Sequence, residues 1–314
     1  MDPLWNSDRM KKLKLYVYPQ ALPHVHDDVE IYFNTVPMSK KGIKDHFELS
    51  SPQEADFFYM GQIPNDKFLN FKKTDFAYFE GNEDRHICDI EGEGGLPIPT
   101  WLHDCVITTM GPIKKYSNIK RLFARPTFSY LLLDIIKNRN EEFDFPGKAS
   151  FGFRGFLNHR IRAMMLHALH HSDFEKELHI NRSWSGPSQV GSQVQEDFIK
   201  TMLTNSLSLC PRGSGIDSVR LLETCYFNRV PILLSDEDYF LVGEDHYDTS
   251  FVYRICGNHL TPEDVKEQLG TIYNTDSAIL EDRANKAKKY FDEVIRVYFD
   301  DPTAYFIKWL KNEN

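Results

Sequence analysis

Short apolar runs alternate along the chain with longer segments that have helical spacing. Strict alternation predicts a first strand over residues 12–18, and compact apolar runs predict further strands at 57–60, 75–79 and 105–109. Gly61 is expected to end the second of these strands. A helix-and-loop region is expected over 31–47 and a capped helical turn over 51–56. Strands that alternate with helices are typical of a parallel α/β sheet.

The same alternation returns after a polar segment at 137–148, which contains Pro146 and Gly147 and predicts a boundary between two units. Beyond it, strands are predicted at 149–153, 177–180, 206–210 and 230–234, and helices at 159–171, 196–203, 219–227, 278–299 and from Pro302 to Leu310. Arg154 and Gly155 are expected to form a turn, and 182–191 a loop. Thr261-Pro262-Glu263-Asp264 has the residues of a helix start.

The pattern predicts two α/β units whose loops face each other. In open parallel sheets, ligands bind at the carboxyl ends of the strands. Phe153 and Cys210 are expected at such ends in the second unit, and Phe79 in the first. Loops that follow these residues are therefore expected to line a shared cleft.

Composition narrows the function classes. The chain has 314 residues, is 41% hydrophobic and carries a formal net charge of -9, which argues against nucleic acid or an anionic membrane as the main partner. Its five cysteines contain no CxxC pair and no zinc spacing. No stretch approaches the roughly 20 apolar residues of a membrane span. We expect a soluble protein, or a soluble fragment whose anchor was removed.

The stretch 207–236 holds the strongest chemical signal. A predicted strand leads into a loop with Gly213, Gly215 and Arg212, and then into a helix that carries Arg220. Amides at a helix N-terminus attract phosphate, and arginine adds a planar cationic group. An anion site is therefore predicted here. Surface salt bridges remain the alternative for both arginines.

This stretch resembles the hallmark segment of the exostosin family of glycosyltransferases. The matching residues are Cys210-Pro211-Arg212-Gly213, Ser218-Val219-Arg220, Glu223 and Pro231-Ile232-Leu233-Leu234-Ser235-Asp236. Weaker similarities are Tyr16-Val17-Tyr18, Pro52-Gln53-Glu54-Ala55-Asp56-Phe57-Phe58, and Phe153-Arg154-Gly155 with Arg162. The chain departs from the family at Asn228-Arg229-Val230, at Glu237-Asp238-Tyr239-Phe240, and at 79–84, where a Gly-x-Asp-His-Phe segment is absent.

The resemblance implies the GT-B architecture, with two Rossmann-like domains that face a cleft and C-terminal helices that cross back towards the first domain. We expect an acceptor-side domain at 1–145, a nucleotide-sugar domain at 146–280, and the crossing helices at 281–314. The implied reaction moves a sugar from a UDP-sugar to an oligosaccharide or glycoprotein, inverts the anomeric carbon and needs no metal or other cofactor. Xylose is one of several donor sugars used in the family.

The resemblance and the anion-site argument together indicate which residues bind the donor. The expected donor-binding residues are Arg154, Pro211, Arg212, Gly213, Ser214, Gly215, Asp217, Ser218, Arg220 and Glu223. Glu223 is expected to accept from the ribose hydroxyls; an ion pair with Arg220 is its alternative.

The chain lacks the family's anchor, so cytoplasm, including a host cytoplasm for a viral or bacterial enzyme, is the expected location. A luminal fragment of a Golgi enzyme is the alternative.

A general base is sought among the acids of the first unit. Glu80, which directly follows a predicted strand, is the first choice, Asp84 the second, and Asp104 with His103 the third. Each has the alternative of a solvated loop residue.

Metal sites are not expected in this chain. Asp236-Glu237-Asp238 has the Asp-x-Asp form but lies in the wrong place for a metal site of that kind. His24 with His26, and His167 with His171, have ligand-like spacing but lack further ligands. Two other functions stay open: an inactive nucleotide- or sugar-binding protein on the same scaffold, and a phosphate-ester enzyme.

Overall fold

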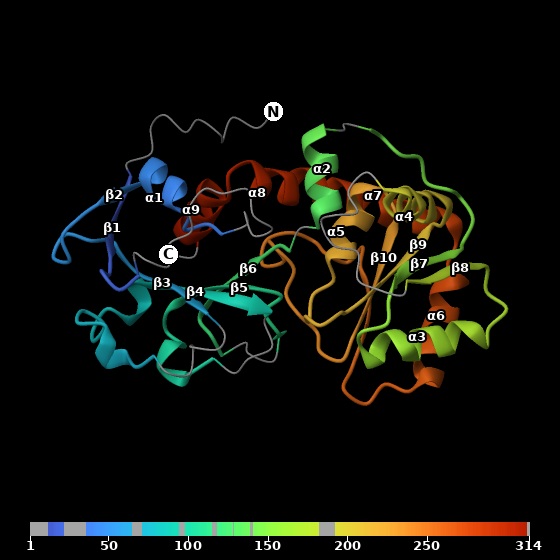
Figure 1. The fold of residues 1–314 in the computed structure, drawn as a ribbon, viewed down its shortest axis with the longest axis horizontal. Coiled ribbons are helices and arrows are strands. Elements are labelled where there is room, and N and C mark those ends of the chain that lie inside the picture. The colour runs from blue at the N-terminus through green and yellow to red at the C-terminus, as the bar shows by residue number, and fades with distance from the viewer. Residues whose placement is uncertain are drawn as a thin grey trace.

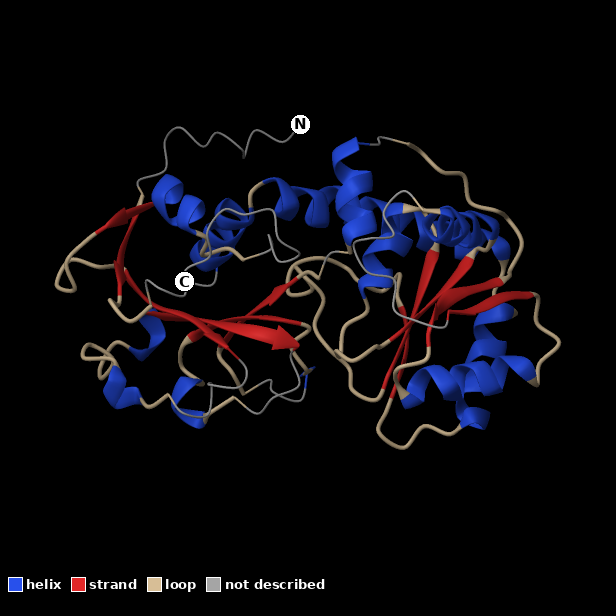
Figure 2. Cartoon of the chain, in the orientation of Figure 1, coloured by secondary structure: helices blue, strands red, loops and turns tan. Residues whose placement is uncertain are grey.

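The chain forms two parallel β-sheets side by side, with helices packed on them (Figures 1 and 2). The structure is a computed structural model that describes residues 12–21, 36–64, 71–93, 98–114, 118–127, 129–138, 141–181 and 192–312. The predicted α/β class with two Rossmann-like units is confirmed.

The first sheet has the strand order β2-β1-β3-β4-β5-β6 within the described residues. Its strands are β1 (Leu13–Val17), β2 (Phe47–Leu49), β3 (Phe57–Pro64), β4 (His86–Glu93), β5 (Val106–Met110) and β6 (Arg121–Arg125), and α1 (Lys40–His46) precedes β2. Successive side chains point to opposite faces, so Tyr59 and Ile87 fill one core while Phe58 and Cys88 fill another. A sheet buried on both faces explains the short apolar runs.

The second sheet has the order β11-β10-β9-β7-β8. Its strands are β7 (Phe151–Phe156), β8 (Lys176–Asn181), β9 (Leu207–Pro211), β10 (Val230–Ser235) and β11 (Tyr253–Cys256). Helices α4 (Gln193–Thr204), α5 (Val219–Tyr226) and α7 (Ser277–Tyr290) cover one face, and α3 (Arg160–His170) and α6 (Pro262–Tyr273) the other (Figure 1). In both sheets the order reverses beside the first strand, which places crevices at the carboxyl ends.

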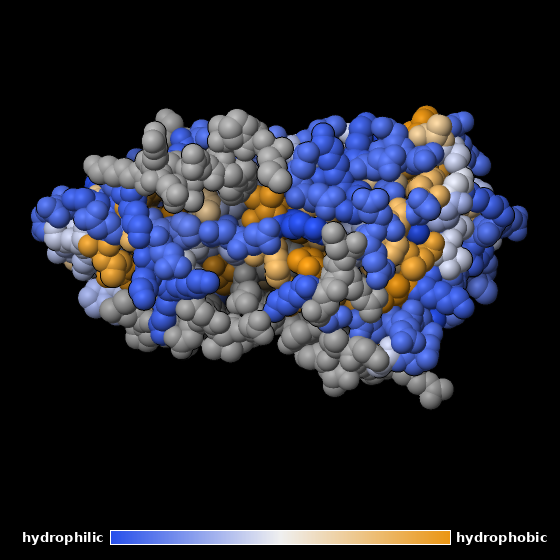
Figure 3. Space-filling view, turned by 90° about the horizontal axis from the view of Figure 1, so that it is seen from above, coloured by the Kyte–Doolittle hydropathy of each residue, from blue (hydrophilic) through white to orange (hydrophobic). Residues whose placement is uncertain are grey.

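The C-terminal helices cross back from the second sheet to the first, as expected. A π-helical turn (Phe291–Ile295) joins α7 to α8 (Arg296–Asp300), and α9 (Pro302–Asn312) follows the predicted break at Pro302. Phe123 on β6 packs against Phe306 and Trp309, with ring centroids 5.0 and 5.1 Å apart. Seen from above, hydrophobic positions show between the two halves and over the helices of the second half (Figure 3).

Three predictions about where strands lie or end are wrong. Residues 75–79 form turns around a 3-10 segment (Lys73–Asp75) because the Asp75 carboxylate accepts from the Lys72 amide at 2.9 Å and holds the chain in a turn. β3 continues through Gly61, which takes φ 93° at a register shift. β7 continues through Arg154 and Gly155 to Phe156, since both pair with β8.

Other elements were predicted only in part. The helix start at Thr261 is confirmed with a capping box to Asp264. β2, β4, β6, β11 and α2 (Tyr130–Asn138) were not predicted. The segment between β6 and β7 contains α2 and an irregular stretch, so the domain limits of 1–145 and 146–280 stay a prediction. The loop prediction at 182–191 and part of the one at 31–47 lie outside the described residues.

Candidate functional site

The carboxyl ends of the two sheets face each other, and the segments that follow the strands touch. Ile113, after β5, forms an antiparallel bridge with Tyr239, after β10. The amide of Lys114 donates to the carbonyl of Asp238 at 2.9 Å. The Lys114 ammonium also lies 3.2 Å from the Asp238 carboxylate and 2.7 Å from that of Glu244. A site built from both sheets is therefore expected at this junction.

The predicted donor loop leaves β9 at this junction and leads into α5. Arg212 is largely buried in it, with a side chain 13% exposed. Its guanidinium donates to the carbonyls of Gly215 at 3.1 Å and Ser214 at 3.2 Å, and to the Asp236 carboxylate at 2.5 Å. Arg212 thus bonds its own loop and the end of β10, and direct contact with a diphosphate stays a prediction.

A second arginine binds the same loop from α3. Arg162 donates to the carbonyl of Phe156 at 2.7 Å, of Arg212 at 2.9 Å and of Pro211 at 3.4 Å. It therefore joins the carboxyl ends of β7 and β9. Burial lowers the pKa of Arg162 to about 10, and the nearby charge of Arg220 adds to the effect. Gly213 lies close beneath it, since a Cβ there would lie 3.1 Å from Nη2 of Arg162.

Arg220 and Arg154 lie deeper, between β7 and the helices above it. Arg220 donates to the carbonyl of Arg154, and its guanidinium carbon lies 4.6 Å from the ring centroid of Phe153 and 5.4 Å from that of Phe198. Burial lowers the pKa of Arg220. The Arg154 guanidinium lies 3.7 Å from Asp197. Their predicted donor contacts stay predictions, and the present partners are the carbonyls of Arg154 and Leu209, two rings and a carboxylate.

Asp236 places a carboxylate beside two arginines and a histidine at the carboxyl edge of the second sheet. Besides Arg212, it lies 3.8 Å from His159 and 3.9 Å from Arg160, both at the start of α3. Burial alone would raise the pKa of Asp236, but the hydrogen bond and charge of Arg212 outweigh it and lower that pKa. Burial lowers the pKa of His159, helped by the charge of Arg212. The anion site predicted here thus contains a carboxylate of the protein itself.

The Asp-x-Asp sequence forms ion pairs. Asp236 bonds Arg212, while Asp238 lies 2.5 Å from Arg254 and 3.2 Å from Lys114. Within the described part of the chain, no cluster of three or more His, Cys, Asp or Glu side chains is arranged to hold a metal. His167 and His171 contact each other edge to face, with ring centroids 4.6 Å apart. His24 and His26 lie outside the described residues.

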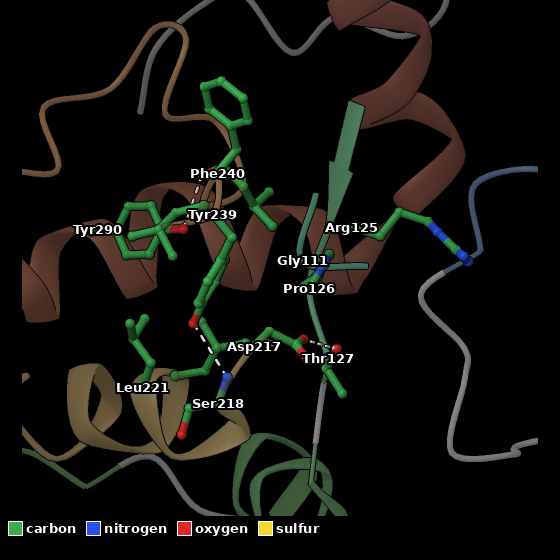
Figure 4. Close-up of a pocket in the computed structure, with 13 residues that line it drawn as sticks. Gly111, Arg125, Pro126, Thr127, Asp217, Ser218, Leu221, Tyr239, Phe240 and Tyr290 are labelled. Carbon is green, nitrogen blue, oxygen red and sulfur yellow. Dashed lines mark hydrogen bonds between the residues drawn. The ribbon is translucent and has the colours of Figure 1, made fainter. Parts of the chain in front are cut away.

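A small cavity lies where the two sheets meet (Figure 4). The cavity has a volume of about 30 Å³, which is room for about two ordered waters. Its lining residues are Gly111, Arg125, Pro126 and Thr127 from the first sheet, and Asp217, Ser218, Leu221, Leu222, Tyr239, Phe240, Leu241, Val242 and Tyr290 from the second half. The cavity is too small for a sugar and marks the contact between the halves.

Two predicted donor residues, Asp217 and Ser218, face this cavity. Thr127 donates to the Asp217 carboxylate, and the amide of Ser218 donates to the Tyr239 hydroxyl at 3.2 Å (Figure 4). Burial raises the pKa of Asp217, although the hydrogen bond from Thr127 opposes the shift. Ser218 occupies the N-cap position of α5 without a side-chain capping bond. Asp217 therefore joins the donor loop to the first sheet.

Glu223 lies on α5 and accepts a hydrogen bond from Ser129, just before α2. Burial raises the pKa of Glu223, against the effects of Ser129 and of the charge of Arg220. Its predicted contact with the ribose stays a prediction, while the bond in place ties α5 to the segment between the sheets.

The three proposed bases lie at the amino edge of the first sheet. Glu80 and Asp84 precede β4, and Asp104 precedes β5. Glu80 is 82% exposed and lies 3.2 Å from Lys73, and Asp104 lies 2.6 Å from Lys120. The expected position next to the cleft is wrong because residues 75–79 are not a strand, so the loop after Phe79 leads into β4 instead of leaving the carboxyl end of a strand. His103, beside Asp104, is 3.1 Å from the Ile98 carbonyl.

Several residues at the carboxyl edge were not predicted as site residues. Arg162 was named only as part of the family motif, and His159, Arg160 and Asn158 not at all. Asn158 donates to the Ser214 hydroxyl at 3.2 Å. The signal that could have found them is their position directly after β7, once that strand is taken to end at Phe156 instead of Phe153.

Comparisons with known proteins give limited likeness. No protein-family model matches the chain, and no curated protein sequence matches it significantly. Among solved structures it is similar to TarM, at 12% identity over 77% of this chain and 57% of TarM, with a TM-score of 0.32. It is similar to a putative UDP-N-acetylglucosamine 2-epimerase from Listeria monocytogenes, at 9% identity over 97% and 98% of the two chains and a TM-score of 0.37. It is also similar to a glycosyltransferase from Rickettsia africae, at 10% identity over 96% of this chain and 100% of that one, with a TM-score of 0.37.

These likenesses add nothing about chemistry, and the two-sheet fold rests on its own topology. The chain spans little more than half of TarM. None of the comparisons shows the exostosin family, so that resemblance rests on the residues quoted above. Within the described residues, no helix has both the length and the apolar character needed to cross a bilayer.

Proposed function

We propose that this chain is a glycosyltransferase that moves a sugar from a UDP-sugar to a hydroxyl of an oligosaccharide or glycoprotein, with inversion and without a metal. The observation that supports it most is the position of the motif 210–220. Its loop leaves β9 at the carboxyl edge of the second sheet and contacts the first sheet through Asp217 and Thr127. In doubly wound folds this edge is where nucleotides bind.

The reaction fits the groups at this edge. The acceptor oxygen forms a bond to the anomeric carbon as the bond from that carbon to the diphosphate oxygen breaks, and UDP leaves with the electron pair. The departing charge needs fixed donors, and loop amides at the start of α5 with cations nearby provide them. Each hydrogen bond to a charged group is worth about 1.5–3 kcal/mol. The acceptor's proton goes to a base, which this fold would carry at the carboxyl edge of the first sheet.

The test is binding followed by turnover. UDP and a panel of UDP-sugars are titrated calorimetrically in EDTA, with CDP, GDP and uridine as controls. We expect UDP to bind in preference to CDP and GDP, and one UDP-sugar to be consumed when a mixed glycan acceptor is added. The anomeric configuration of the product is then read by NMR. Absence of binding for every nucleoside diphosphate would remove the proposal, and binding that requires a metal would remove the metal-independent form.

One observation favours an alternative, a nucleotide-sugar-binding protein without activity. The three acids considered as bases lie at the amino edge of the first sheet, away from the loop that would bind the donor. Such a protein binds UDP with the same preference but neither hydrolyses nor transfers the sugar. Measurement of UDP release over many hours at high protein concentration separates the two.

A further inference from the structure

Two arginine side chains donate hydrogen bonds to the backbone carbonyls of the donor loop. Arg162 donates to the carbonyls of Pro211 and Arg212. Arg212 donates to those of Ser214 and Gly215, and its Nε also lies 3.5 Å from the carbonyl of Gly213. Five consecutive carbonyls, 211 to 215, are therefore bonded to guanidinium groups.

Peptide geometry fixes where the neighbouring amides point. In a planar trans peptide the C=O of one residue and the N–H of the next are antiparallel. The Pro211 carbonyl faces Arg162, and the amide of Arg212 accordingly donates the other way, to the Leu234 carbonyl at 2.9 Å. The next four amides, 213 to 216, face away from the guanidinium groups in the same manner. Among the hydrogen bonds of the described residues, none uses these four amides as donors.

Both guanidinium groups are already hydrogen-bonded within the protein. Arg162 has three of its nitrogens on carbonyls. Arg212 has its third nitrogen, Nη1, on the Asp236 carboxylate, which neutralises its charge. A diphosphate that bonded Arg212 directly would have to displace both the loop carbonyls and Asp236. Binding to the amides displaces neither. Within the part of the chain that the structure describes, these amides have no hydrogen-bond partner, and backbone N–H groups need one, so an anion would supply it.

We infer that Arg162 and Arg212 are positioning residues, which bond the loop carbonyls and so present the amides of residues 213–216 to the donor diphosphate. This inference rests on the proposed function for the identity of the anion. Asn158 holds the loop at the Ser214 hydroxyl, and Gly213 allows the close approach of Arg162. An arginine is needed at both positions because one planar group must reach several carbonyls, which a lysine ammonium does not do in the same geometry.

The test compares charge with geometry. Arg212→Lys and Arg162→Lys keep the positive charge but lose the planar guanidinium group that reaches several carbonyls. Arg160→Gln is the matched control, since it removes a charge beside Asp236, and the carbonyl to which Arg160 donates among the described residues is that of Asn258, outside the loop. Hydrogen exchange in the ligand-free protein is followed by NMR at the amides of Arg212 and Ser218, which lie at the two ends of the loop and donate to the Leu234 carbonyl and the Tyr239 hydroxyl. Affinities for inorganic pyrophosphate, UDP and uridine are measured by calorimetry.

We expect Arg212→Lys and Arg162→Lys to speed exchange in the loop and to weaken pyrophosphate and UDP by about tenfold or more each, with uridine unchanged. Arg160→Gln should leave loop exchange as it is and weaken both anions by less than about threefold. Wild-type affinity in both lysine variants would overturn the inference, because charge alone would then suffice. Lost affinity with unchanged exchange would also overturn it, because the guanidinium would then bond the anion directly.

A second measurement does not depend on the arginines. Replacing Ser214 or Gly215 by its α-hydroxy acid turns one amide into an ester and removes a single N–H. Pyrophosphate affinity should fall by about tenfold at one position or both; no loss at either contradicts the inference. Pyrophosphate that binds to these amides, without any preference for UDP among nucleoside diphosphates, would leave the loop assignment standing and remove the proposed function.

Discussion

Thr127, two residues beyond β6, donates a hydrogen bond to the carboxylate of Asp217, which lies just before α5. The first sheet is thereby bonded directly to the loop that is proposed to bind the donor. The close approach depends on Gly111, which takes φ 52° and where a Cβ would lie 3.0 Å from the Asp217 side chain. A change at Asp217 is therefore felt both in stability and in the position of the donor loop.

Asp217→Asn should gain stability over the wild type as the pH rises. Burial raises the pKa of Asp217 in the folded protein. The contribution that favours folding is therefore present below the unfolded pKa of about 3.9 and is lost as the pH rises through the folded value. Asparagine keeps an acceptor oxygen for Thr127 without the charge. Urea unfolding from about pH 4 to about pH 7 measures the difference. Thr127→Val removes the hydrogen bond that opposes the raised pKa of Asp217 and is the control, which should lose more stability at about pH 7 than at about pH 4.

His86 should make the protein acid-sensitive. Its ring is buried, lies 3.0 Å from the Tyr18 hydroxyl and stacks on Phe58 at 4.8 Å, and burial lowers its pKa to about 4. A lowered histidine pKa gives stability that is present above the unfolded value of about 6.5 and is lost as the pH falls towards the folded value. The loss attributable to His86 is up to about 3 kcal/mol.

His86→Gln is the comparison for that effect, since it keeps a polar side chain without the titration. It should be less stable than the wild type at about pH 7 and show a shallower decline on acidification. Parallel declines of the two proteins, followed by urea unfolding, would show that other groups cause the acid sensitivity.

The buried ion pair of Asp89 and Arg125 should be costly to break from one side. Their side chains lie 3.0 Å apart and are 0% and 2% exposed. Thr108 also donates to Asp89 at 2.9 Å. Arg125→Leu leaves a buried carboxylate without its cation and should cost about 3–5 kcal/mol in unfolding free energy. The double variant Asp89→Leu with Arg125→Leu should recover part of that loss; a double variant as unstable as the sum of the single ones would contradict this account.

Replacing the acids at the amino edge of the first sheet should leave turnover intact. Glu80→Gln, Asp84→Asn and Asp104→Asn are each expected to keep kcat/KM within about threefold of the wild type. The reason is their position before β4 and β5, opposite the edge that carries the donor loop. Initial rates with the preferred UDP-sugar measure the effect. A loss of about a hundredfold or more in any of them would place the reaction at the other edge of the sheet.

The sequence predicted the second sheet better than the first. β9 and β10 are apolar runs with every residue buried, so local pattern and tertiary position agree. β4 contains charged residues, and its Asp89 is buried only because Arg125, 36 positions later in the chain, pairs with it. Such a strand is invisible to hydrophobic periodicity. Residues 75–79 are the reverse case: Phe76 and Phe79 are buried and give the segment an apolar, strand-like pattern, but the chain there forms a turn.

The site divides along the same line. The loop motif could be read from glycines, arginines and a helix start, and it does lie at the carboxyl edge. The partners of the arginines could not be read, because they are backbone carbonyls from β7 and from the loop itself. The bases were misplaced because one wrong strand assigns a loop to the wrong edge of a parallel sheet.

The π-helical turn at Phe291–Ile295 has a consequence for how one helix can serve two cores. An added residue rotates everything that follows by about 100° around the helix axis. Phe291 packs against Tyr226 over the second sheet, while Tyr298 reaches Phe123 of the first. The turn therefore acts as a phase shift, and a deletion of one residue within it would aim the aromatic side chains beyond it away from the sheet that they now cover.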